Sequence, residues 1–315
     1  MRIYHGVEQM QPSLEASVVT IGNFDGVHLG HQQLLETVAR EAQYFNVPSV
    51  VYTFDPHPAK VLHPERATER LFDLKDQMEQ FAERSMDLVI IEPFTKEFAK
   101  ITPQDFLENC LCKKLNPKTL VVGHDFSFGK DRAGNIPFLE NFCKEKGIRL
   151  IIIPPFQTQG VVVSSSKIRA ALAAGEIEKA SEFLGRSYYL RGSVEKGFQR
   201  GRTIGVPTAN VHPEIEFLPR KGVYFTLTKF GGHLHPSITN IGVNPTFHED
   251  KKSPIKIETH IFDFDAQLYG LEVEVFLLHF LRDEKKFNGL DELKNQIQQD
   301  LTLARKYFDE RAKNS

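Results

Sequence analysis

The sequence predicts an α/β domain built on a parallel sheet, followed by a small antiparallel β-barrel with a C-terminal helix. In the first part of the chain, short apolar runs alternate with helix-like stretches, whereas in the second part strand-like runs follow one another directly. The length of 315 residues also exceeds what one hydrophobic core usually holds. We therefore expect two domains, 1–184 and 185–315, with the boundary near Gly185.

Each element of the first domain follows from a local pattern. The run SVVTI predicts a strand buried on both faces, and Leu34, Leu35, Val38 and Ala39 recur at helical spacing just after it. The predicted strands are 17–21, 48–54, 87–93, 118–123 and 148–154. The predicted helices are 31–45, 102–115 and 135–146. Strands and helices in this alternation form a parallel sheet with right-handed crossovers, and such sheets bind ligands beyond the carboxyl ends of their strands.

The second domain is expected to consist of strands until its last helix. Turn residues separate the runs, and Gly231–Gly232 is the expected turn of a hairpin. The predicted strands are 188–197, 222–230, 234–242, 253–264 and 271–280. One amphipathic helix is predicted from apolar residues at steps of three and four, namely Leu290, Leu293, Ile297, Leu301, Ala304 and Phe308.

Composition excludes several classes of function. The net charge of -2 gives no reason to expect a nucleic-acid partner, and no apolar run has the length of about 18 to 20 residues that a membrane helix needs. The amino terminus lacks the apolar segment of a secretory signal. Cys110 and Cys112 have no second pair to complete a metal site, so we expect them to be buried thiols, with Cys143 as the third cysteine. These observations predict a cytoplasmic protein with no membrane partner.

The stretch GNFDGVHLGH, residues 22–31, lies between the end of a predicted strand and the start of a helix. Unpaired backbone N–H groups and the helix dipole favour an anion there. Gly22, Gly26 and Gly30 let a large anionic ligand approach the backbone, and His28 and His31 are close enough in sequence to share that ligand. A turn that happens to contain histidines is the alternative. The whole stretch suits a nucleoside triphosphate, to whose developing charge an imidazole can donate a hydrogen bond.

This stretch resembles the signature of the nucleotidyltransferase superfamily, which has a Rossmann-like sheet, and in particular the variant of prokaryotic FAD synthetases. The resemblance implies that Gly22, Asn23, Phe24 and Gly30 contact ATP. It also implies that His28 and His31 act in catalysis at the phosphates.

Three further segments of the first domain match this family in order. TFDPHP contains Asp55 and His57, VGHDFSFG contains Asp125, Phe126 and Phe128, and SSSKIR contains Ser164, Ser165 and Arg169. The resemblance implies that the first two segments bind the flavin. It also implies that Ser164 and Arg169 are catalytic groups that hold the leaving phosphates, and that Ser165 binds ATP. Taken singly, the serines could be a helix cap and the phenylalanines could belong to the core.

In the second domain, GRTIGVPTAN, residues 201–210, resembles the signature of riboflavin kinases. Thr208 and Asn210 supply a hydroxyl and an amide oxygen, which are hard ligands suited to Mg²⁺. A capped turn is the alternative for these two residues taken alone. Gly197, Gly201 and Gly205 are expected to let a loop fold over ATP, and Arg282 is a further expected flavin contact.

The run IKIETHI alternates strictly between two faces. Ile257 and Thr259 share one face, and Glu258 lies on the other, away from the aliphatic side chains. A solvated strand glutamate is the simpler interpretation from the pattern alone. The resemblance assigns the position to the catalytic glutamate of the kinase, so Glu258 is expected to be the general base.

The chain as a whole thus resembles bifunctional riboflavin kinase/FAD synthetases. The resemblance implies that riboflavin is phosphorylated to FMN by ATP with Mg²⁺, and that FMN is adenylylated by ATP to FAD and pyrophosphate. Flavin-accepting apoproteins are further candidate partners. Another nucleotidyltransferase, or a non-catalytic flavin or nucleotide sensor, remains the alternative function.

Overall fold

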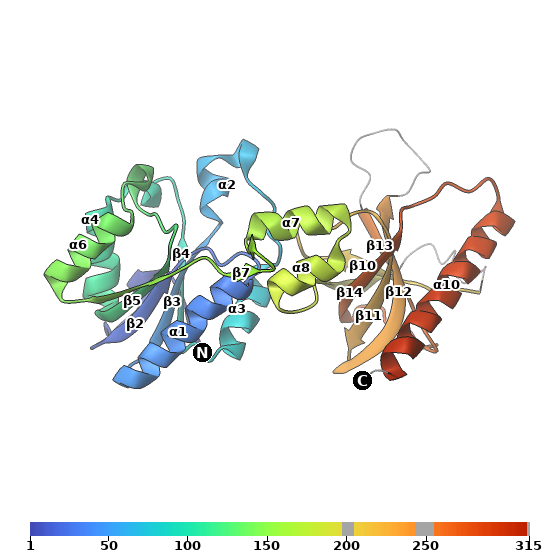
Figure 1. Ribbon diagram of the computed structural model, residues 1–315, viewed down its shortest axis with the longest axis horizontal. Coiled ribbons are helices and arrows are strands. Elements are labelled where there is room, and N and C mark those ends of the chain that lie inside the picture. Colours follow the sequence, from blue (N-terminus) through green and yellow to red (C-terminus); the bar gives the residue numbers. More distant parts are fainter. Residues whose placement is uncertain (197–204, 244–254, 314–315) are drawn as a thin grey trace. The chain divides into compact units, whose positions relative to one another are not determined.

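The computed structural model describes residues 1–196, 205–243 and 255–313. The contacts divide the chain into two compact units, Met1–Ser165 and Ser166–Ser315, each of which is described by itself (Figure 1). Within these described residues, no helix is both long and apolar enough to cross a membrane.

The first unit is built around a six-stranded sheet in which every pairing is parallel. The strand order is β1-β4-β3-β2-β5-β6. The strands are β1 (Arg2–His5), β2 (Ser17–Ile21), β3 (Ser49–Asp55), β4 (Leu88–Pro93), β5 (Pro117–Gly123) and β6 (Arg149–Ile153). A two-stranded hairpin, β7 (Gln157–Thr158) and β8 (Val161–Val162), follows the sheet. The parallel sheet and its five predicted strands are confirmed, and β1 is an additional edge strand.

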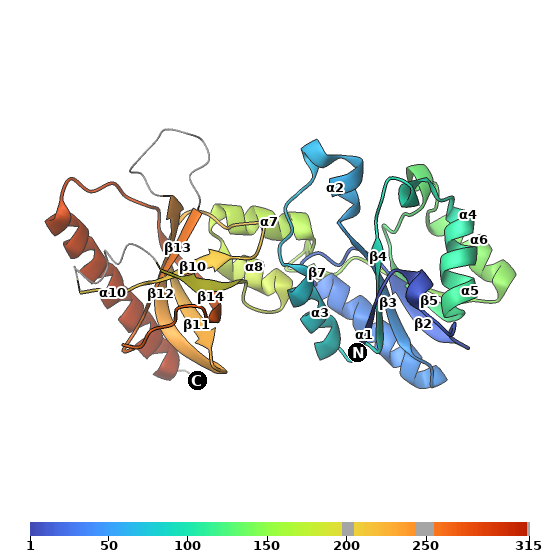
Figure 2. The same cartoon turned by 180° about the vertical axis from the view of Figure 1, so that it is seen from behind.

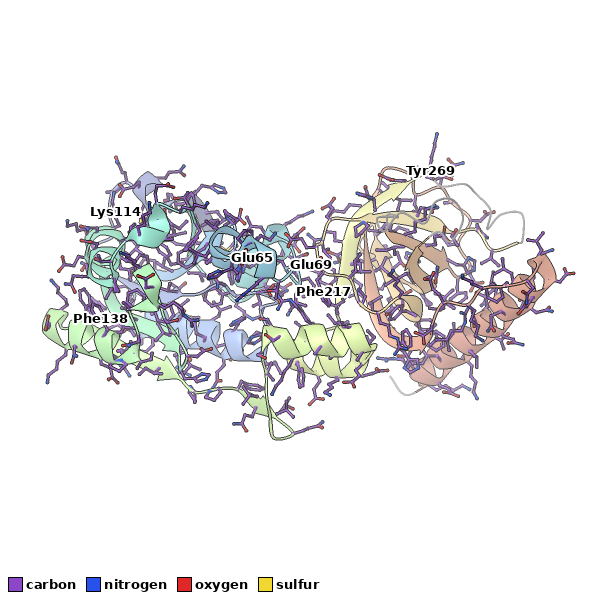
Figure 3. The ribbon with its side chains drawn as sticks, turned by 90° about the horizontal axis from the view of Figure 1, so that it is seen from above. Glu65, Glu69, Lys114, Phe138, Phe217 and Tyr269 are labelled. Atoms are coloured by element: carbon purple, nitrogen blue, oxygen red, sulfur yellow. The ribbon has the colours of Figure 1, made fainter. Side chains whose placement is uncertain are left out.

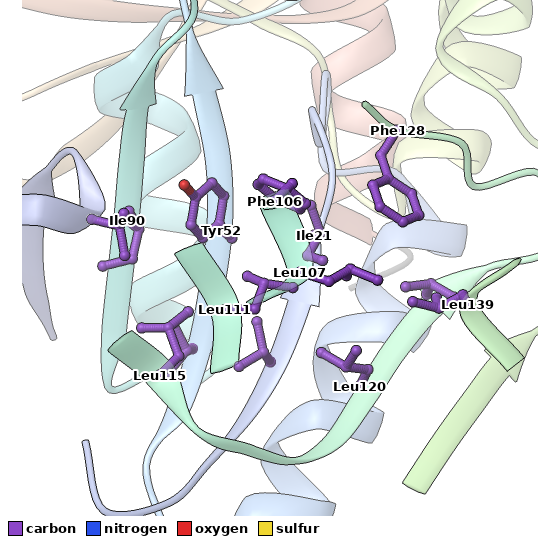
Figure 4. Close-up of a cluster of buried hydrophobic side chains, with 14 of the residues drawn as sticks. Ile21, Tyr52, Ile90, Phe106, Leu107, Leu111, Leu115, Leu120, Phe128 and Leu139 are labelled. Atoms are coloured by element: carbon purple, nitrogen blue, oxygen red, sulfur yellow. The ribbon is translucent and has the colours of Figure 1, made fainter. Parts of the chain in front are cut away.

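Helices cover both faces of this sheet. The helices of the unit are α1 (Leu29–Phe45), α2 (Pro58–Leu62), α3 (Leu74–Glu83), α4 (Pro103–Asp105), α5 (Lys113–Leu115) and α6 (Ile136–Lys146), with short turns η1 (Val7–Gln9), η2 (Pro64–Arg66), η3 (Phe98–Lys100) and η5 (Lys130–Arg132). Side chains of α1 and α3 pack with Val18, Val51 and Val121 on one face. Side chains of the 103–115 segment and α6 pack with Tyr52 and Leu120 on the other (Figure 4).

The predicted helix at 102–115 is helical but not uniform. It runs from α4 through a π-helical segment, η4 (Phe106–Cys112), into α5. Cys110 and Cys112 lie on this segment and are only half-buried, so the expectation of buried thiols holds fully for Cys143 alone. Desolvation raises the pKa of the Cys110 thiol to about 11, so it stays protonated near neutral pH. Among the described residues no group of three or more His, Cys, Asp or Glu side chains could hold a metal.

The second unit contains a closed barrel of six antiparallel strands. Its order is β10-β13-β12-β11-β14-β9, and β9 pairs with β10 to close it. The strands are β9 (Tyr189–Glu195), β10 (Ala209–Pro213), β11 (Gly222–Phe230), β12 (His233–Val243), β13 (Ile255–Ile261) and β14 (Glu272–Arg282). The barrel is therefore confirmed, with β10 as a strand that the sequence pattern did not predict. Gly231 and Gly232 form the two-residue turn between β11 and β12, both with positive φ, as expected.

The barrel interior contains hydroxyl groups that satisfy one another. The Thr226 hydroxyl lies 2.8 Å from those of Ser237 and Thr239, and the hydroxyls of Thr239 and Thr259 are 3.0 Å apart. All four residues are fully buried. Because buried polar groups are costly unless they are paired, this network fixes which side chains of β11, β12 and β13 face inward.

Helices pack on the outside of the barrel (Figure 2). The predicted C-terminal helix is α10 (Leu290–Lys313), and its Ala304 is buried with Val223, Phe225 and Ile238. The unit also contains most of α7 (Ser165–Ala174) and all of α8 (Ile177–Leu184). Within the unit, Arg220 donates a hydrogen bond to the carbonyl of Ala174 and pairs with Asp283, and so fastens the α7–α8 turn.

Candidate functional site

The sheet of the first unit reverses its winding direction beside β2. From β2 the chain adds β3 and then β4 on one side, and then returns to place β5 on the other side of β2. β2 ends at Ile21 and β5 ends at Gly123, so the segments 22–31 and 124–129 both leave the sheet at this switch point. Open parallel sheets bind their ligands at such a point, and the two motifs that sequence analysis selected meet there.

The imidazoles of His28 and His31 are stacked at the N-terminus of α1. Their ring centroids are 3.7 Å apart, with 17° between the ring planes. His28 is the N-cap residue and is 8% exposed. Burial first, and the neighbouring His28 ring second, lower the pKa of His31 well below its ordinary value of 6.5. Because the buried Nδ1 of His31 has no hydrogen-bond partner within the described ranges, the neutral ring keeps hydrogen-bonding capacity for a ligand.

The backbone of this segment contains several residues with positive φ. Phe24, Gly26 and Val27 all have positive φ, at 50°, 81° and 39°. A side chain at Gly30 would place its Cβ 3.3 Å from the His28 imidazole, so glycine there lets the ring lie against the helix. Phe24 is buried, and its ring contacts His31 edge to face at 5.4 Å. Phe24 therefore orients His31, while Gly22 and the exposed Asn23 lie between it and the strand.

The end of β3 contributes two of the predicted flavin-binding residues. The Asp55 carboxylate forms a 2.8 Å ion pair with Arg70. The ring of His57 accepts a hydrogen bond from the Ala59 N–H and so caps α2. The structure thus gives both side chains local partners at the carboxyl edge of the sheet.

The three predicted residues that follow β5 differ in how deeply they are buried. Asp125 has 84% of its side chain exposed. Phe126 is half-buried, and its ring stacks on Phe128 with centroids 5.2 Å apart. Phe128 itself belongs to the core, where it contacts Phe106 and covers Gly134 (Figure 4). The structure leaves Asp125 and the outer side of Phe126 accessible to a ligand.

The serine segment joins the first unit to α7. The Ser165 hydroxyl donates a 2.9 Å hydrogen bond to the carbonyl of Asp25, which ties the start of α7 to the histidine segment. Ser164 precedes it and is half-buried. Arg169 lies one turn further along α7, within the second unit.

One end of the barrel has a small cavity that contains both predicted metal ligands. Thr208 and Asn210 line it together with Thr259 and Tyr269, and Tyr269 is labelled at the edge of the barrel in Figure 3. Its volume of about 60 Å³ has room for a few water-sized groups, such as a hydrated ion or one phosphate. Gly205, with φ of 78°, forms the turn before this segment. Gly197 and Gly201 lie outside the described residues.

Glu258 lies directly beside Asn210. The two residues are cross-strand partners in the β10–β13 ladder, and such partners have Cβ atoms about 5 Å apart. Ile257 and Thr259, its neighbours in the chain, are buried inside the barrel, so Glu258 faces outward, as the alternation predicted. The structure therefore places the predicted base next to Asn210, a predicted metal ligand that lines the cavity.

Arg282 has a different environment. Its guanidinium forms a fork with the buried Asp300 of α10, with a shortest distance of 2.6 Å. Arg282 is the cross-strand partner of Val223 on β11. Val223 pairs in turn with Asn240, and Asn240 pairs with Glu258, so Arg282 and Glu258 lie in one row of the barrel. The first role that the structure shows for Arg282 is thus to hold α10 against the barrel.

Two further residues lie at these sites and were not predicted from the sequence. The Phe156 Cβ lies 3.5 Å from the Cβ position at Gly30, so this side chain packs beside the histidines. Tyr269 lines the barrel cavity and lies 6.0 Å from the Lys196 ammonium. Only tertiary contacts reveal that these two side chains lie at the sites.

Comparisons with known proteins assign a family to each part of the chain. A family model described as FAD synthetase matches residues 10–167, and one described as riboflavin kinase matches residues 184–308. The bifunctional riboflavin kinase/FMN adenylyltransferase of Buchnera aphidicola from Acyrthosiphon pisum is 36% identical, with 98% of each chain covered. The protein of the same name from Escherichia coli K12 is 37% identical, again over 98% of each chain.

A solved structure shares the fold over the same extent. It is described as a macrolide-efflux protein from Streptococcus pneumoniae, and it superposes with a TM-score of 0.85 at 31% identity. The match covers 96% of this chain and 98% of the Streptococcus chain. Since the matches extend over both units and nearly the full length of these relatives, the chain belongs to the family of bifunctional riboflavin kinase/FMN adenylyltransferases.

Proposed function

We propose that the barrel phosphorylates riboflavin with ATP to give FMN, and that the first unit adenylylates FMN with a second ATP to give FAD and pyrophosphate. The observation that carries this proposal is the presence of two candidate sites in two separate units. One is the stacked histidine pair at the N-terminus of α1, and the other is the Thr208–Asn210 cavity beside Glu258.

For adenylyl transfer, the FMN phosphate attacks the α-phosphate of ATP. This nucleophile is already ionised at neutral pH, so the step needs positioning and charge neutralisation rather than a strong base. His28 and His31, beside the N–H groups that begin α1, stabilise the developing charge. Ser164 and Arg169 hold the departing pyrophosphate, and Ser165 anchors their segment through Asp25.

For flavin binding in the first unit, we assign the contacting surface to Asp125 and Phe126. Phe128 supports Phe126 from the core, since the two rings are stacked. Asp55 and His57, at the end of β3 on the other side of β2, complete the expected contacts. In the second unit, Arg282 remains our candidate for a flavin contact, held in place by Asp300.

For riboflavin phosphorylation, Glu258 takes the proton of the 5′-hydroxyl as that oxygen attacks the γ-phosphate of ATP, and ADP leaves. The hydroxyl of Thr208 and the amide oxygen of Asn210 suit Mg²⁺, which prefers oxygen ligands and is often held by few protein groups together with substrate phosphates. Mg²⁺ neutralises phosphate charge when it is bound there. The small cavity fits one such ion with its waters.

The metal assignment is tested by Thr208→Ala and Asn210→Ala. We expect both variants to need more Mg²⁺ for half-maximal riboflavin phosphorylation and to lose most kinase activity, while supplied FMN is still adenylylated. A matched control is Thr302→Ala, which removes an exposed hydroxyl on α10. Normal kinase activity at low Mg²⁺ in either cavity variant would overturn the assignment.

Product analysis tests the two-reaction proposal as a whole. Riboflavin, ATP and Mg²⁺ are incubated with the chain, and flavins are separated by chromatography. We expect FMN and then FAD to accumulate, with ADP and pyrophosphate as the other products. A different nucleotidyltransferase would produce no FMN from riboflavin, and a flavin or nucleotide sensor would leave all substrates unchanged.

We also propose a cytoplasmic location, in keeping with the three free cysteines, and flavin-dependent apoproteins as recipients of the products.

A further inference from the structure

Three polar side chains form a row across neighbouring strands of the barrel. In the β10–β13 ladder Asn210 is the partner of Glu258, and in the β12–β13 ladder Glu258 is the partner of Asn240. The carboxylate of Glu258 is thus flanked by an asparagine on each side. Cross-strand partners have Cβ atoms about 5 Å apart, which is within reach of a hydrogen bond between a carboxylate and an amide.

Asn240 faces the same side of the barrel as Glu258. Its chain neighbours Thr239 and Ile241 are fully buried inside the barrel, so the side chain of Asn240 points outward, and it is half-buried. Among the residues that the structure describes, neither Asn240 nor Glu258 uses its side chain in a hydrogen bond to another residue. Two half-buried polar groups placed side by side on adjacent strands are therefore available to each other and to a substrate.

The two asparagines offer different chemistry to the carboxylate. Asn210 lines the cavity, where its amide oxygen is our proposed metal ligand. Asn240 lies on the opposite side of Glu258 and does not line that cavity. Its amide nitrogen has two N–H donors, and an ionised carboxylate accepts hydrogen bonds only.

We propose that, once substrates are bound, Asn240 acts as a positioning residue that donates a hydrogen bond from its Nδ2 to the Glu258 carboxylate and so orients the general base of the kinase. One carboxylate oxygen is held by Asn240, and the other faces the riboflavin 5′-hydroxyl. The O–H bond breaks and its proton moves to Glu258. The hydroxyl oxygen bonds to the γ-phosphorus, and the bond between that phosphorus and the β,γ-bridging oxygen breaks to release ADP. This inference rests on the proposed role of Glu258.

Asn240→Ala and Asn240→Asp separate positioning from packing. Alanine removes the donor. Aspartate keeps the shape of asparagine, replaces the donor with an acceptor and adds a like charge beside Glu258. We expect kcat for riboflavin phosphorylation to fall by about 10- to 10²-fold in both variants, because a misplaced catalytic group loses that much rate. KM for riboflavin and ATP should change little, and adenylylation of supplied FMN should stay at the wild-type rate.

A double-mutant cycle with Glu258→Gln gives the decisive readout. If Asn240 acts through Glu258, then Asn240→Ala should have almost no further effect on kcat once Glu258 is glutamine. The matched control is Asn288→Ala, an exposed asparagine that bonds Glu292 outside the barrel strands. It should leave kcat unchanged in either background.

The outcomes distinguish this inference from the function on which it rests. Near-normal kcat in Glu258→Gln overturns the assignment of the base. A low kcat in Glu258→Gln with an independent, multiplicative loss from Asn240→Ala overturns only the positioning role. A rise in KM for riboflavin at constant kcat, or full activity in Asn240→Asp, also contradicts it. Asn240→Ser serves as the replacement if the alanine variant does not fold, as judged by its melting temperature.

Discussion

His28 and His31 stack face to face at the start of α1, with ring centroids 3.7 Å apart. Two charged imidazoliums at this separation would repel each other strongly, so at most one of the rings is positively charged in the free enzyme. The pair can therefore offer neutral N–H donors to an incoming triphosphate without first losing a proton from His31, whose pKa is well below 6.5. Replacement of either ring should damage adenylyl transfer specifically.

We predict that His28→Ala and His31→Ala each lower the rate of FAD formation from FMN by about 10²- to 10³-fold, because each removes a preorganised donor to developing charge. FMN formation from riboflavin should be unchanged. His5→Ala is the control, since His5 is exposed on the edge strand β1. Equal losses of both activities in a folded variant would contradict the assignment of these histidines to one reaction.

The pKa of His31 also predicts a pH dependence of stability. Burial and then the His28 ring hold this pKa below 6.5, so below that pH the unfolded chain binds a proton at His31 that the folded chain does not. Above about pH 6.5 His31 is neutral in both the folded and the unfolded chain, so it does not lower the stability. As the pH falls below this value, the free energy of unfolding decreases by up to about 1.4 kcal/mol per pH unit. Urea unfolding between about pH 5 and 7 should show a shallower dependence in His31→Gln than in wild type. Identical slopes would argue against a buried neutral His31.

The stacked pair Phe126 and Phe128 predicts two different consequences of the same substitution. Phe128→Ala empties a core position and should lower the free energy of unfolding by about 3–5 kcal/mol. Phe126→Ala removes a half-buried ring and should mainly weaken the binding of FMN in the adenylyltransferase reaction. Thermal melting and the KM for FMN measure the two effects. A Phe126→Ala variant with an unchanged KM and a large loss of stability would place this ring in the core instead.

The extent of the kinase unit can be tested with two fragments. A fragment of residues 166–315 keeps α8, whose Ile177, Phe183 and Leu184 are buried, and the 2.6 Å hydrogen bond between Glu178 and His279 on β14. A fragment of residues 187–315 keeps the barrel and α10 but loses these contacts. We expect both fragments to phosphorylate riboflavin and the longer one to melt at a higher temperature. Equal melting temperatures would show that α8 contributes nothing to the barrel.

Much of the fold could be predicted from local patterns. The strand at 17–21 matches β2 because all five of its residues are buried and three of them, Val18, Val19 and Ile21, are apolar. β1 was missed because it is a short edge strand with mostly exposed residues, and β10 because Val211 is its only fully buried residue. Neither strand has the alternation or the apolar run on which the prediction depends.

The candidate sites were predictable to different degrees. The closeness of His28 and His31 follows from a spacing of three residues at the start of a helix, but their stacking and burial depend on tertiary packing. The alternation of β13 predicted the face of Glu258. Its placement between Asn210 and Asn240 depends on the register of three strands, and register is set by interior packing that a single sequence does not display.

The central claim is that one chain carries two separate catalytic sites, with Glu258 as the base of the kinase. The most direct measurement is the flavin product pattern of Glu258→Gln and His31→Ala, each incubated with ATP and Mg²⁺ and either riboflavin or FMN. We predict that Glu258→Gln forms FMN about 10²- to 10⁴-fold more slowly and still converts supplied FMN to FAD, whereas His31→Ala accumulates FMN and forms little FAD. Near-normal FMN formation by Glu258→Gln, or loss of both products in either folded variant, would contradict the account.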